Sequence, residues 1–365
     1  MRRLVIDGRS LRGQRDGLAT YLGELAPRIV SEAHDTDVTI IANPATIGYW
    51  EAAAPAANVI VSDSRPMWPG QNVTVPRLLN RLRPDAYFYP AHDPPMLTRV
   101  PFVFVIQDVI SHTLRPYYER LDRSKRAYSR AVTEIGLRRA ARVLVPSEAT
   151  REAVADVFGR RVLERIDVVP LAAGPAGPAT TIPEQRSRLL YVGTDLPQKN
   201  LRRLVLAYAE AAQRLEDPPV LEIVGQLRRA DDLQRLVESL GLGSKVAILG
   251  HLSDAALEQA YARAVALVIP SLAEGFGLTI LEAMARSIPV VTSNCSACAE
   301  VAGDAAVLVD PFDVSSIADG IVTVATQSAL RASLVRKASK RAEQFSWDRC
   351  AAQTLQSLRR VAATD

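Results

Sequence analysis

Short runs of apolar, often β-branched residues recur along the 365-residue chain and alternate with longer segments whose apolar residues return every three or four positions. A short continuous apolar run is typical of a strand buried in a parallel sheet, and the longer pattern is typical of an amphipathic helix. The runs predict strands at residues 4–7, 38–42, 59–61, 87–89, 102–106, 143–147 and 166–170, and again at 188–193, 220–225, 246–250, 265–269 and 288–292. Strands that alternate with helices predict an α/β protein with doubly wound parallel sheets.

The segment at residues 171–184, LAAGPAGPATTIPE, interrupts this alternation. It is rich in Ala, Gly and Pro and has no apolar period, which is typical of a linker. A chain of this length exceeds what one core usually serves. We therefore predict an N-terminal domain at 1–170 and a C-terminal domain at 185–345, followed by an amphipathic helix at 346–363.

The stretch at residues 264–293 joins two predicted strands through a glycine-bearing turn and a short helical pattern. Gly275 and Gly277 let the backbone approach a ligand closely, and helical spacing begins at Leu278. A loop that leads into a helix start presents N–H groups to an anion. The stretch therefore predicts an anion site.

Two carboxylates, Glu274 and Glu282, bracket this predicted site. Glu282 stands early in the helix, where the helix dipole favours a negative side chain. A carboxylate can also accept hydrogen bonds from two ribose hydroxyls of a nucleotide whose phosphates rest on a helix start. Both interpretations of Glu282 stay open.

The sequence SLAEGFGLTILEAMA, with its Glu-x7-Glu spacing, resembles the donor-site signature of retaining GT-B glycosyltransferases of family 4. The resemblance implies two doubly wound Rossmann-like domains facing a cleft, with the 346–363 helix packed back on the first. It also implies hexosyl transfer, with retention, from a nucleotide diphosphate sugar to a hydroxyl of a glycan or lipid-linked acceptor. By resemblance, Glu282 holds the ribose, and the donor sugar and phosphate face Glu274, Gly275, Phe276, Gly277 and Leu278. Thr279 departs from the pattern, since Pro is frequent there.

Lys199 follows the strand at 188–193 and stands near a predicted helix start. By resemblance it contacts the donor diphosphate, and we expect it to act with Glu274 in catalysis. The family usually adds an Arg nearby, but this chain has Thr194 and Gln198 at those positions. Thr194 is therefore expected among the donor contacts without a charge of its own. The alternative for Lys199 is an ordinary surface lysine.

Further candidates lie in the first half of the chain. Gly17 follows a glycine-bearing loop and is expected to bind the donor, although Ala19 replaces the second glycine usual in the family. His92 lies just past a strand end, where ligands of open α/β sheets bind, and is an acceptor-side candidate; the alternative is a loop histidine bonded locally. Gln107 and Asp108 follow the next strand, where the family often has His-Asp. Gln107 can orient a sugar or acceptor but cannot titrate.

The formal net charge is +4, and the basic excess lies in the first 170 residues. Much of it falls in residues 115–142, where arginines are mixed with Tyr117, Tyr118 and Tyr128. This segment is either a solvated helix face or a surface for anionic lipid. Nucleic-acid binding is not expected, because no recognisable motif for it is present.

Composition gives expectations for the compartment and for metals. No run reaches 18 apolar residues, the N-terminus lacks a signal-peptide pattern and there are three cysteines, so we expect a cytoplasmic protein with peripheral contact at the inner face of the cell membrane. Cys295 and Cys298 have no second ligand pair, and residues 35–37, Asp-Thr-Asp, are interpreted as a polar turn. We predict no metal site, no cofactor and metal-independent transfer.

The donor and two other functional classes stay open at this point. GDP-mannose is the first donor candidate by resemblance, but the base, sugar, acceptor, linkage and oligomeric state are not identified. Gln107, Thr194 and Ala19 leave open a catalytically silent nucleotide-binding partner subunit. A nucleotide-sugar epimerase shares the architecture, but the Glu-x7-Glu loop disfavours it.

Overall fold

The computed structural model describes residues 1–11, 17–66, 68–115, 119, 122–174 and 187–363. The chain divides into two compact units. Unit 1 comprises Met1–Thr113, Tyr118–Leu171 and Ser346–Asp365, and unit 2 comprises Leu114–Tyr117 and Ala172–Phe345. Most of the predicted linker, residues 175–184, lies outside the described residues, as do Tyr117 and Tyr118 of the basic segment.

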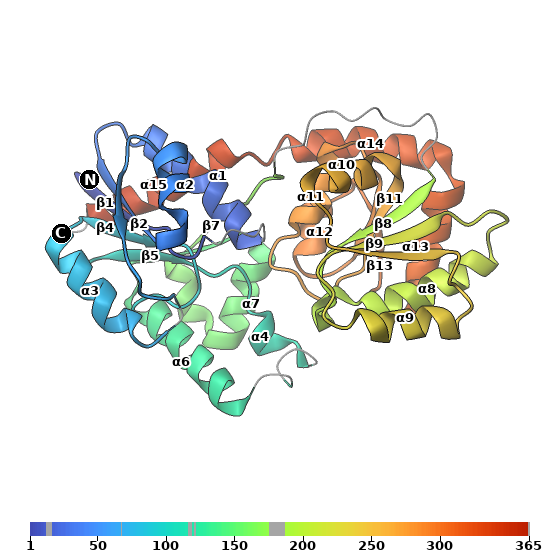
Figure 1. Cartoon of the computed structure of the whole chain (residues 1–365), viewed down its shortest axis with the longest axis horizontal. Coiled ribbons are helices and arrows are strands. Elements are labelled where there is room, and N and C mark those ends of the chain that lie inside the picture. The colour runs from blue at the N-terminus through green and yellow to red at the C-terminus, as the bar shows by residue number, and fades with distance from the viewer. Residues whose placement is uncertain (12–16, 67, 116–118, 120–121, 175–186, 364–365) are drawn as a thin grey trace. The chain divides into compact units, whose positions relative to one another are not determined.

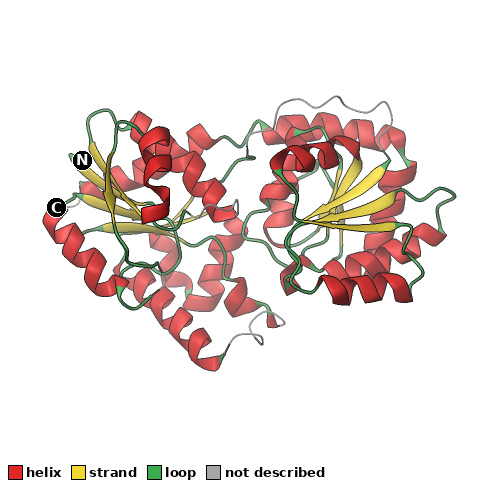
Figure 2. Cartoon of the chain, viewed as in Figure 1, coloured by secondary structure: helices red, strands yellow, loops and turns green. Residues whose placement is uncertain are grey.

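Unit 1 is built on a seven-stranded parallel sheet with the strand order β3-β2-β1-β4-β5-β6-β7 (Figures 1 and 2). Its strands are β1 (Arg3–Asp7), β2 (Asp37–Ala42), β3 (Asn58–Val61), β4 (Ala86–Tyr89), β5 (Phe102–Val105), β6 (Arg142–Val145) and β7 (Ile166–Val168). The helical segments are α1 (Gly17–Glu32), η1 (Pro44–Thr46), α2 (Ile47–Ala53), α3 (Gln71–Leu82), α4 (Ile110–Thr113), α6 (Arg123–Arg139), α7 (Glu148–Phe158), η2 (Arg160–Arg165) and α15 (Trp347–Ala362).

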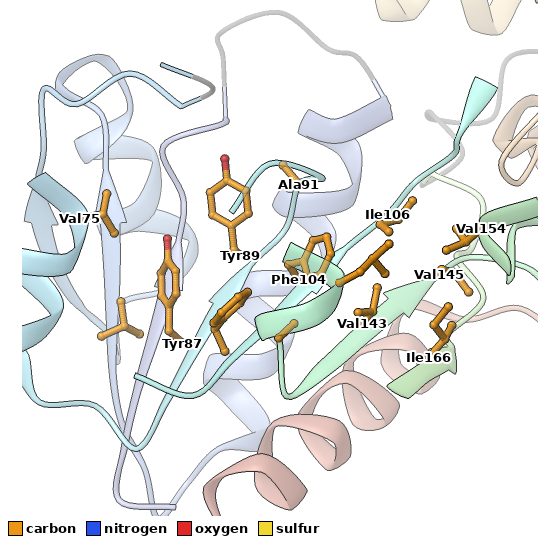
Figure 3. Close-up of a cluster of buried hydrophobic side chains, with 14 of the residues drawn as sticks. Val75, Tyr87, Tyr89, Ala91, Phe104, Ile106, Val143, Val145, Val154 and Ile166 are labelled. Atoms are coloured by element: carbon orange, nitrogen blue, oxygen red, sulfur yellow. The ribbon is translucent and has the colours of Figure 1, made fainter. Parts of the chain in front are cut away.

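The core of unit 1 forms because β4 and β5 carry bulky residues on both faces. All residues of both strands are buried, as expected for central strands covered by helices. Figure 3 shows Tyr87, Tyr89 and Phe104 in one apolar cluster with Val143 and Ile166 from β6 and β7. The core thereby fixes the strands whose ends carry the candidate residues of this unit.

The C-terminal helix α15 returns to unit 1 and packs against α1 and the sheet. The side chain of Ser346 caps it by accepting a hydrogen bond from the Arg349 N–H at 3.1 Å. Trp347 is 6% exposed, and its ring centroid lies 6.2 Å from that of Tyr21 on α1. The amphipathic pattern at 346–363 thus forms a helix whose apolar face is buried.

Unit 2 contains a six-stranded parallel sheet with the order β10-β9-β8-β11-β12-β13 (Figure 1). Its strands are β8 (Arg188–Val192), β9 (Val220–Val224), β10 (Val246–Gly250), β11 (Ala264–Ile269), β12 (Val290–Ser293) and β13 (Val307–Val309). The helical segments are η3 (Pro197–Lys199), α8 (Leu201–Gln213), α9 (Ala230–Ser239), α10 (Asp254–Arg263), α11 (Leu278–Ala285), α12 (Ser296–Ala302), α13 (Val314–Thr326) and α14 (Ser328–Ala342).

The predicted α/β class with two doubly wound parallel sheets is confirmed. The strand predicted at 288–292 instead begins at Val290, because Pro289 has no N–H with which to join the ladder as a donor. No helix in the described ranges is long and apolar enough to cross a membrane.

Each sheet has one point at which the strand order reverses direction. In unit 1 this point lies between β1 and β4, and in unit 2 it lies between β8 and β11. The loops that leave two such strands at their carboxyl ends run to opposite sides, and this opens a crevice where ligands of α/β proteins bind.

Candidate functional site

The loops after β8 and β11 of unit 2 bring Lys199 and Glu274 together. The Lys199 Nζ atom lies 2.6 Å from Glu274 Oε1, and their side chains are 24% and 12% exposed. The Ser271 hydroxyl donates a second hydrogen bond, of 2.7 Å, to the same oxygen. Lys199 and Glu274 lie 75 positions apart in the sequence. They meet because β8 and β11 are neighbours at the switch point.

Asn200 fixes the turn that presents Lys199. It has a left-handed φ of 58°, which an asparagine tolerates better than most residues. Its buried side-chain amide donates to the carbonyls of Pro270 at 2.9 Å and Pro311 at 2.7 Å. The turn is thus tied to the loops after β11 and β13. Sequence reasoning missed Asn200, although an Asn directly before a helix was an available signal.

The glycine-bearing turn delivers the start of α11 to the same edge. Gly277 has a φ of 106°, so a side chain at this position would be strained, and it directly precedes Leu278, the first residue of the helix. The first N–H groups of an α-helix have no partner within the helix. The main chain of Glu274 is positioned as well, because its N–H donates to Ser296 Oγ at 3.2 Å. The structure thus places a helix start beside the predicted anion site.

Phe276 serves this turn through packing. It is 5% exposed, and its ring meets that of Phe345 edge to face, with centroids 5.7 Å apart. A buried aromatic ring between two glycines holds a flexible segment in one conformation. Because its ring is buried, Phe276 is expected to contact a ligand through its main-chain N–H group.

Glu282 lies further along α11 and is oriented by a separate group of side chains. The Tyr261 hydroxyl donates to Glu282 Oε2 at 3.1 Å. Burial first, and the Glu282 charge second, hold the pKa of Tyr261 well above its ordinary value, so the phenol keeps its proton and stays a donor. The Arg286 guanidinium lies 4.8 Å from the Tyr261 ring centroid and donates to the Glu282 carbonyl at 2.9 Å and to Glu258 at 2.9 and 2.5 Å.

Sequence reasoning missed Tyr261, Arg286 and Glu258, because they come from two helices and no local motif joins them. Their arrangement bears on both interpretations of Glu282. A Glu placed only for the helix dipole needs no partner from another helix, whereas this carboxylate has one of its two oxygens held from α10. The geometry therefore favours an oriented acceptor of hydrogen bonds.

A pocket of about 400 Å³ lies at the carboxyl ends of β8, β9 and β10, and its lining includes Thr194, Gly225, Arg228 and His251. Gly225 is required here, since it has a φ of 144° and an added Cβ would lie 1.8 Å from the Gly193 carbonyl oxygen. Thr194 Oγ1 is buried and has no hydrogen-bond partner within the described residues. The pocket and His251 were missed as candidates, although His251 directly follows a strand end.

In unit 1, Gln107 and Asp108 follow β5 as predicted. Gln107 is half-buried, and its Nε2 atom has no hydrogen-bond partner within the part of the chain that the structure describes. Asp108 is exposed, and its Oδ1 atom accepts from the Ile110 N–H at 3.0 Å, which starts α4. Gln107 thus retains an unsatisfied donor, while at least part of Asp108's role is structural.

His92 and Asp93 follow β4, the neighbouring strand. His92 is half-buried, whereas Asp93 is only 6% exposed and accepts from the Tyr89 hydroxyl at 3.2 Å. Burial raises the pKa of Asp93 to about 6, although His92 and the Tyr89 hydrogen bond act in the opposite direction. Sequence reasoning selected His92 and passed over Asp93, whose burial only the fold creates.

Gly17 is the first residue of α1 and is exposed. Residues 12–16 of the preceding loop lie outside the described residues. Ala19, which stands where the family usually has its second glycine, is 8% exposed. Gly17 is therefore at a helix start, and its expected contact with the donor stays a prediction.

At the switch point of unit 1, Asp7 and Arg9 form a buried ion pair that sequence reasoning did not single out. Their side chains are 1% and 0% exposed, and Arg9 donates to the two oxygens of Asp7 at 2.8 and 2.6 Å. The Tyr87 hydroxyl donates to Asp7 Oδ2 at 2.5 Å. The carboxylate is thus fully engaged with protein donors.

Within the described residues, no group of three or more His, Cys, Asp and Glu side chains could hold a metal ion. Cys295 and Cys298 are free thiols, and burial raises the pKa of Cys298 to about 12. The thiol of Cys298 therefore stays protonated near neutral pH.

Two families match the chain by sequence, the Glycosyl transferases group 1 at residues 178–341 and the Glycosyltransferase Family 4 at residues 15–173. The chain is 35% identical over 227 residues to O-antigen chain mannosyltransferase B of Escherichia coli, covering 58% of this chain and 59% of that protein. It is 32% identical over 209 residues to MMP alpha-(1->4)-mannosyltransferase of Mycolicibacterium hassiacum, covering 55% and 50%. The chain thus spans less than two thirds of the length of these relatives.

Among solved structures, HepE from Anabaena in complex with UDP and glucose has a TM-score of 0.76 at 19% identity, covering 99% of this chain and 100% of that one. WaaG, a glycosyltransferase involved in lipopolysaccharide biosynthesis, has a TM-score of 0.74 at 19% identity, covering 97% and 99%. Two Rossmann-like units of this kind define the GT-B class. With both halves of its sequence matched, the chain belongs to the group 1 glycosyltransferases of the family 4-like type. The predicted family and fold are confirmed.

The buried carboxyl of Asp93 leads us to expect a specific pH dependence of stability. Its pKa is about 6 in the folded protein and 3.8 ordinarily, so between these values the folded protein keeps a proton that the unfolded chain has lost. Raising the pH from about 4 to about 6 therefore favours unfolding, by about 3 kcal/mol in total. Asp93→Asn carries no charge at any pH. We expect its free energy of unfolding to rise by about 3 kcal/mol relative to that of the wild type between pH 4 and pH 6, and to show no such gain below pH 4.

Urea unfolding measured from pH 4 to 8 checks this expectation. Asp35→Asn removes an exposed carboxylate of the same unit and should leave the pH dependence unchanged. Parallel pH profiles for Asp93→Asn and the wild type would show that folding leaves the pKa of Asp93 unchanged.

Proposed function

We propose that the protein is a retaining glycosyltransferase that moves a hexosyl group, with mannose favoured, from a nucleotide diphosphate sugar to a hydroxyl of a glycan or lipid-linked acceptor. The observation that carries the proposal is the Lys199–Glu274 pair beside the start of α11, at the switch point of unit 2. The mannosyl preference rests on relatives named as mannosyltransferases. GDP-mannose is accordingly the first donor candidate, although HepE was solved with UDP and glucose.

In this proposal the donor lies along the carboxyl edge of the unit 2 sheet. The diphosphate meets the N–H groups at the start of α11 and the ammonium of Lys199, which would exchange part of its contact with Glu274 for phosphate. Glu282 accepts the ribose hydroxyls with the oxygen that Tyr261 leaves available. The base enters the pocket of about 400 Å³, where Arg228 and His251 provide polar contacts.

The chemistry follows from which groups can carry charge. The acceptor oxygen bonds to the anomeric carbon on the face from which the phosphate oxygen departs, and the acceptor proton passes to that departing oxygen. Lys199 and the helix start stabilise the charge that grows on the phosphate, and Glu274 supports the sugar as positive charge develops on it. Gln107 orients a ligand without titrating, so this route requires neither a histidine at that position nor a bond between sugar and protein.

A silent nucleotide-binding subunit remains the second candidate. It is favoured by the uncharged Thr194 and Gln107, whose buried polar atoms have no partners within the described residues. Turnover of a nucleotide sugar by the protein alone separates the two candidates. The GDP, UDP, ADP and dTDP hexoses form the donor panel.

Contact with an anionic membrane is proposed for the first turns of α6. Arg123, Lys125 and Tyr128 all lie exposed on this part of the helix, and the buried positions begin only at Val132. A basic surface that also carries a tyrosine suits the headgroup region of a bilayer. The lipid-linked class of acceptor would be presented at such a surface.

The first test of the transferase separates turnover from binding. Glu274→Ala and Glu274→Gln should lower kcat by roughly 100-fold, because each removes a preorganised charge near the reacting carbon. Glu282→Ala should mainly weaken donor binding, by about 10-fold, through lost contacts to the ribose. Lys199→Ala should weaken donor binding through lost contacts to the phosphate and should also lower kcat, since Lys199 stabilises the departing phosphate. Gln107→Ala should be milder than Glu274→Ala, and Gln107→His should raise turnover if the family's usual histidine contributes.

Steady-state kinetics and nucleotide binding by calorimetry give the required measurements. Glu238→Ala, an exposed glutamate on α9, is the control and should behave as the wild type. If Glu274→Ala keeps full turnover while the fold and nucleotide binding stay intact, the hypothesis that the loop after β11 serves a transferase is wrong.

The second test concerns Tyr261, which we propose as a positioning residue for Glu282. Tyr261→Phe removes the hydroxyl that holds Glu282 Oε2 and should raise the Kd of the nucleoside diphosphate by about 3- to 10-fold. The loss of affinity should be smaller for the 2′-deoxynucleotide, because it lacks one of the two ribose hydroxyls that donate to Glu282. Tyr208→Phe, which loses a hydroxyl bonded to the Pro219 carbonyl, is the control. An equal loss for both nucleotides would assign Tyr261 a purely structural role.

The third test concerns metal ions. Because Lys199 and the helix start supply positive charge at the diphosphate, transfer should continue at an unchanged rate in EDTA. The rate is measured before and after chelation and again with added magnesium or manganese. A rate that falls in EDTA and returns with either ion would contradict metal independence.

The fourth test concerns the membrane. Reversing two charges in Arg123→Glu/Lys125→Glu should weaken co-sedimentation with anionic vesicles at least 10-fold, since each basic residue near such a surface contributes about 1 kcal/mol. Arg336→Glu/Lys340→Glu makes the same charge change on an exposed face of α14 and is the control. Wild-type binding that is no stronger to anionic than to neutral vesicles would leave α6 with a solvated face only.

A further inference from the structure

Trp68 is the exposed member of the chain's three tryptophans. It is 62% exposed, whereas Trp50 and Trp347 are 0% and 6% exposed. It lies in the loop between the end of β3 and the start of α3, of which the structure describes residues 62–66 and 68–70. This loop therefore leaves the carboxyl edge of the unit 1 sheet, the edge at which ligands of parallel α/β sheets bind.

The loop is held in place from two sides at Ser64. The Arg9 guanidinium donates to the Ser64 carbonyl at 2.9 Å, and the Thr74 hydroxyl of α3 donates to Ser64 Oγ at 2.7 Å. Arg9 is itself fixed by the buried pair with Asp7. Ser64, four residues before Trp68, is thus tied to both the sheet and the following helix.

The buried Asp7–Arg9 pair is not explained by its contribution to stability alone. Taking both charges out of water costs several kcal/mol per ion, and a well-packed apolar pair is often at least as stable. What Arg9 adds beyond its contacts with Asp7 is the hydrogen bond to the loop, 55 residues away. Through Arg9, the pair therefore ties Ser64 to the switch point of unit 1.

We propose that Trp68 is a stacking platform for a pyranose ring of a saccharide acceptor. The C–H face of a pyranose is apolar and slightly positive, and it complements the negative face of an indole. Asp63 and Arg65, both exposed in the same loop, can bind neighbouring sugar hydroxyls. Asp63 and Arg65 cancel each other's charge, so this loop lacks the basic cluster that attracts an anionic lipid, and it is assigned to the glycan class of acceptor.

Stacking can be tested by fluorescence without any turnover. The probes are methyl pyranosides and disaccharides of mannose, glucose, galactose and N-acetylglucosamine. At least one should change the emission of the wild type saturably, and this change should be lost in Trp68→Ala, because the other two tryptophans are buried. Phe312→Ala, which removes a side chain of similar exposure from unit 2, should keep the response. No response to any probe, or an unchanged response in Trp68→Ala, would overturn the proposal.

Kinetics test the acceptor role, which rests on the proposed function. Trp68→Ala should raise the KM for the acceptor by roughly 3- to 10-fold, with a smaller change in kcat and in the donor KM, and Trp68→Phe should recover most of the loss. An unchanged acceptor KM would overturn the acceptor role. If a saccharide changes the Trp68 emission but no nucleotide sugar is turned over, the proposed transferase function is wrong and the stacking site is still supported. Emission that shifts with neutral vesicles and with no saccharide would make Trp68 a membrane contact instead.

Discussion

The contact between Lys199 and Glu274 is the interaction on which the rest of the donor-side arrangement depends. Each charge lies at the end of a different strand, and neither is fully exposed. A partly buried ion pair is favourable only when its geometry is held and its remaining hydrogen-bonding capacity is used. Ser271 and Asn200 meet these conditions, the first by donating to Glu274 and the second by fixing the turn of Lys199. The donor site proposed above therefore requires no large rearrangement of the backbone for this pair to exchange contacts with a phosphate.

The main chain around the pair adopts conformations that only certain residues tolerate. Asn200 and Gly277 both have positive φ angles, one at the turn before α8 and the other at the start of α11. Such conformations persist where the surrounding contacts determine them, and they concentrate at ligand sites. Here the buried amide of Asn200 and the buried ring of Phe276 are those contacts. Precision at the site is therefore supplied by side chains that themselves need not touch the ligand.

Local patterns in the sequence were sufficient to predict the two sheets and the helix start at Leu278, because strand and helix periods are local properties. The candidates in unit 2 were predictable for the same reason, since Lys199 and Glu274 each follow a strand end. The partners of Glu282 were not predictable. Tyr261 meets it only when α10 packs beside α11, and no spacing within one segment records that contact.

Burial is the other property that local patterns could not provide. Asp93 stands beside His92 in the sequence, and only the fold shows that the carboxyl is the more buried of the two and carries the shifted pKa. Asp7 and Tyr87 are 80 positions apart and meet because β1 and β4 are neighbours at the switch point. A polar residue at a strand end thus predicts an edge of the sheet, but its environment depends on the neighbouring strand.

An ion pair lies at the switch point of each sheet, and the two pairs differ in their exposure to water. In unit 2 the pair keeps part of its surface exposed, so its charges stay available to a ligand. In unit 1 the Asp7–Arg9 pair is closed to water, and Tyr87 engages one of the two Asp7 oxygens. A carboxylate so engaged has little capacity left for a sugar or a phosphate, so other polar side chains of unit 1, such as Gln107, are the candidates for ligand contact. The same position in two sheets of one topological class thus holds a partly exposed ion pair in one unit and a buried one in the other.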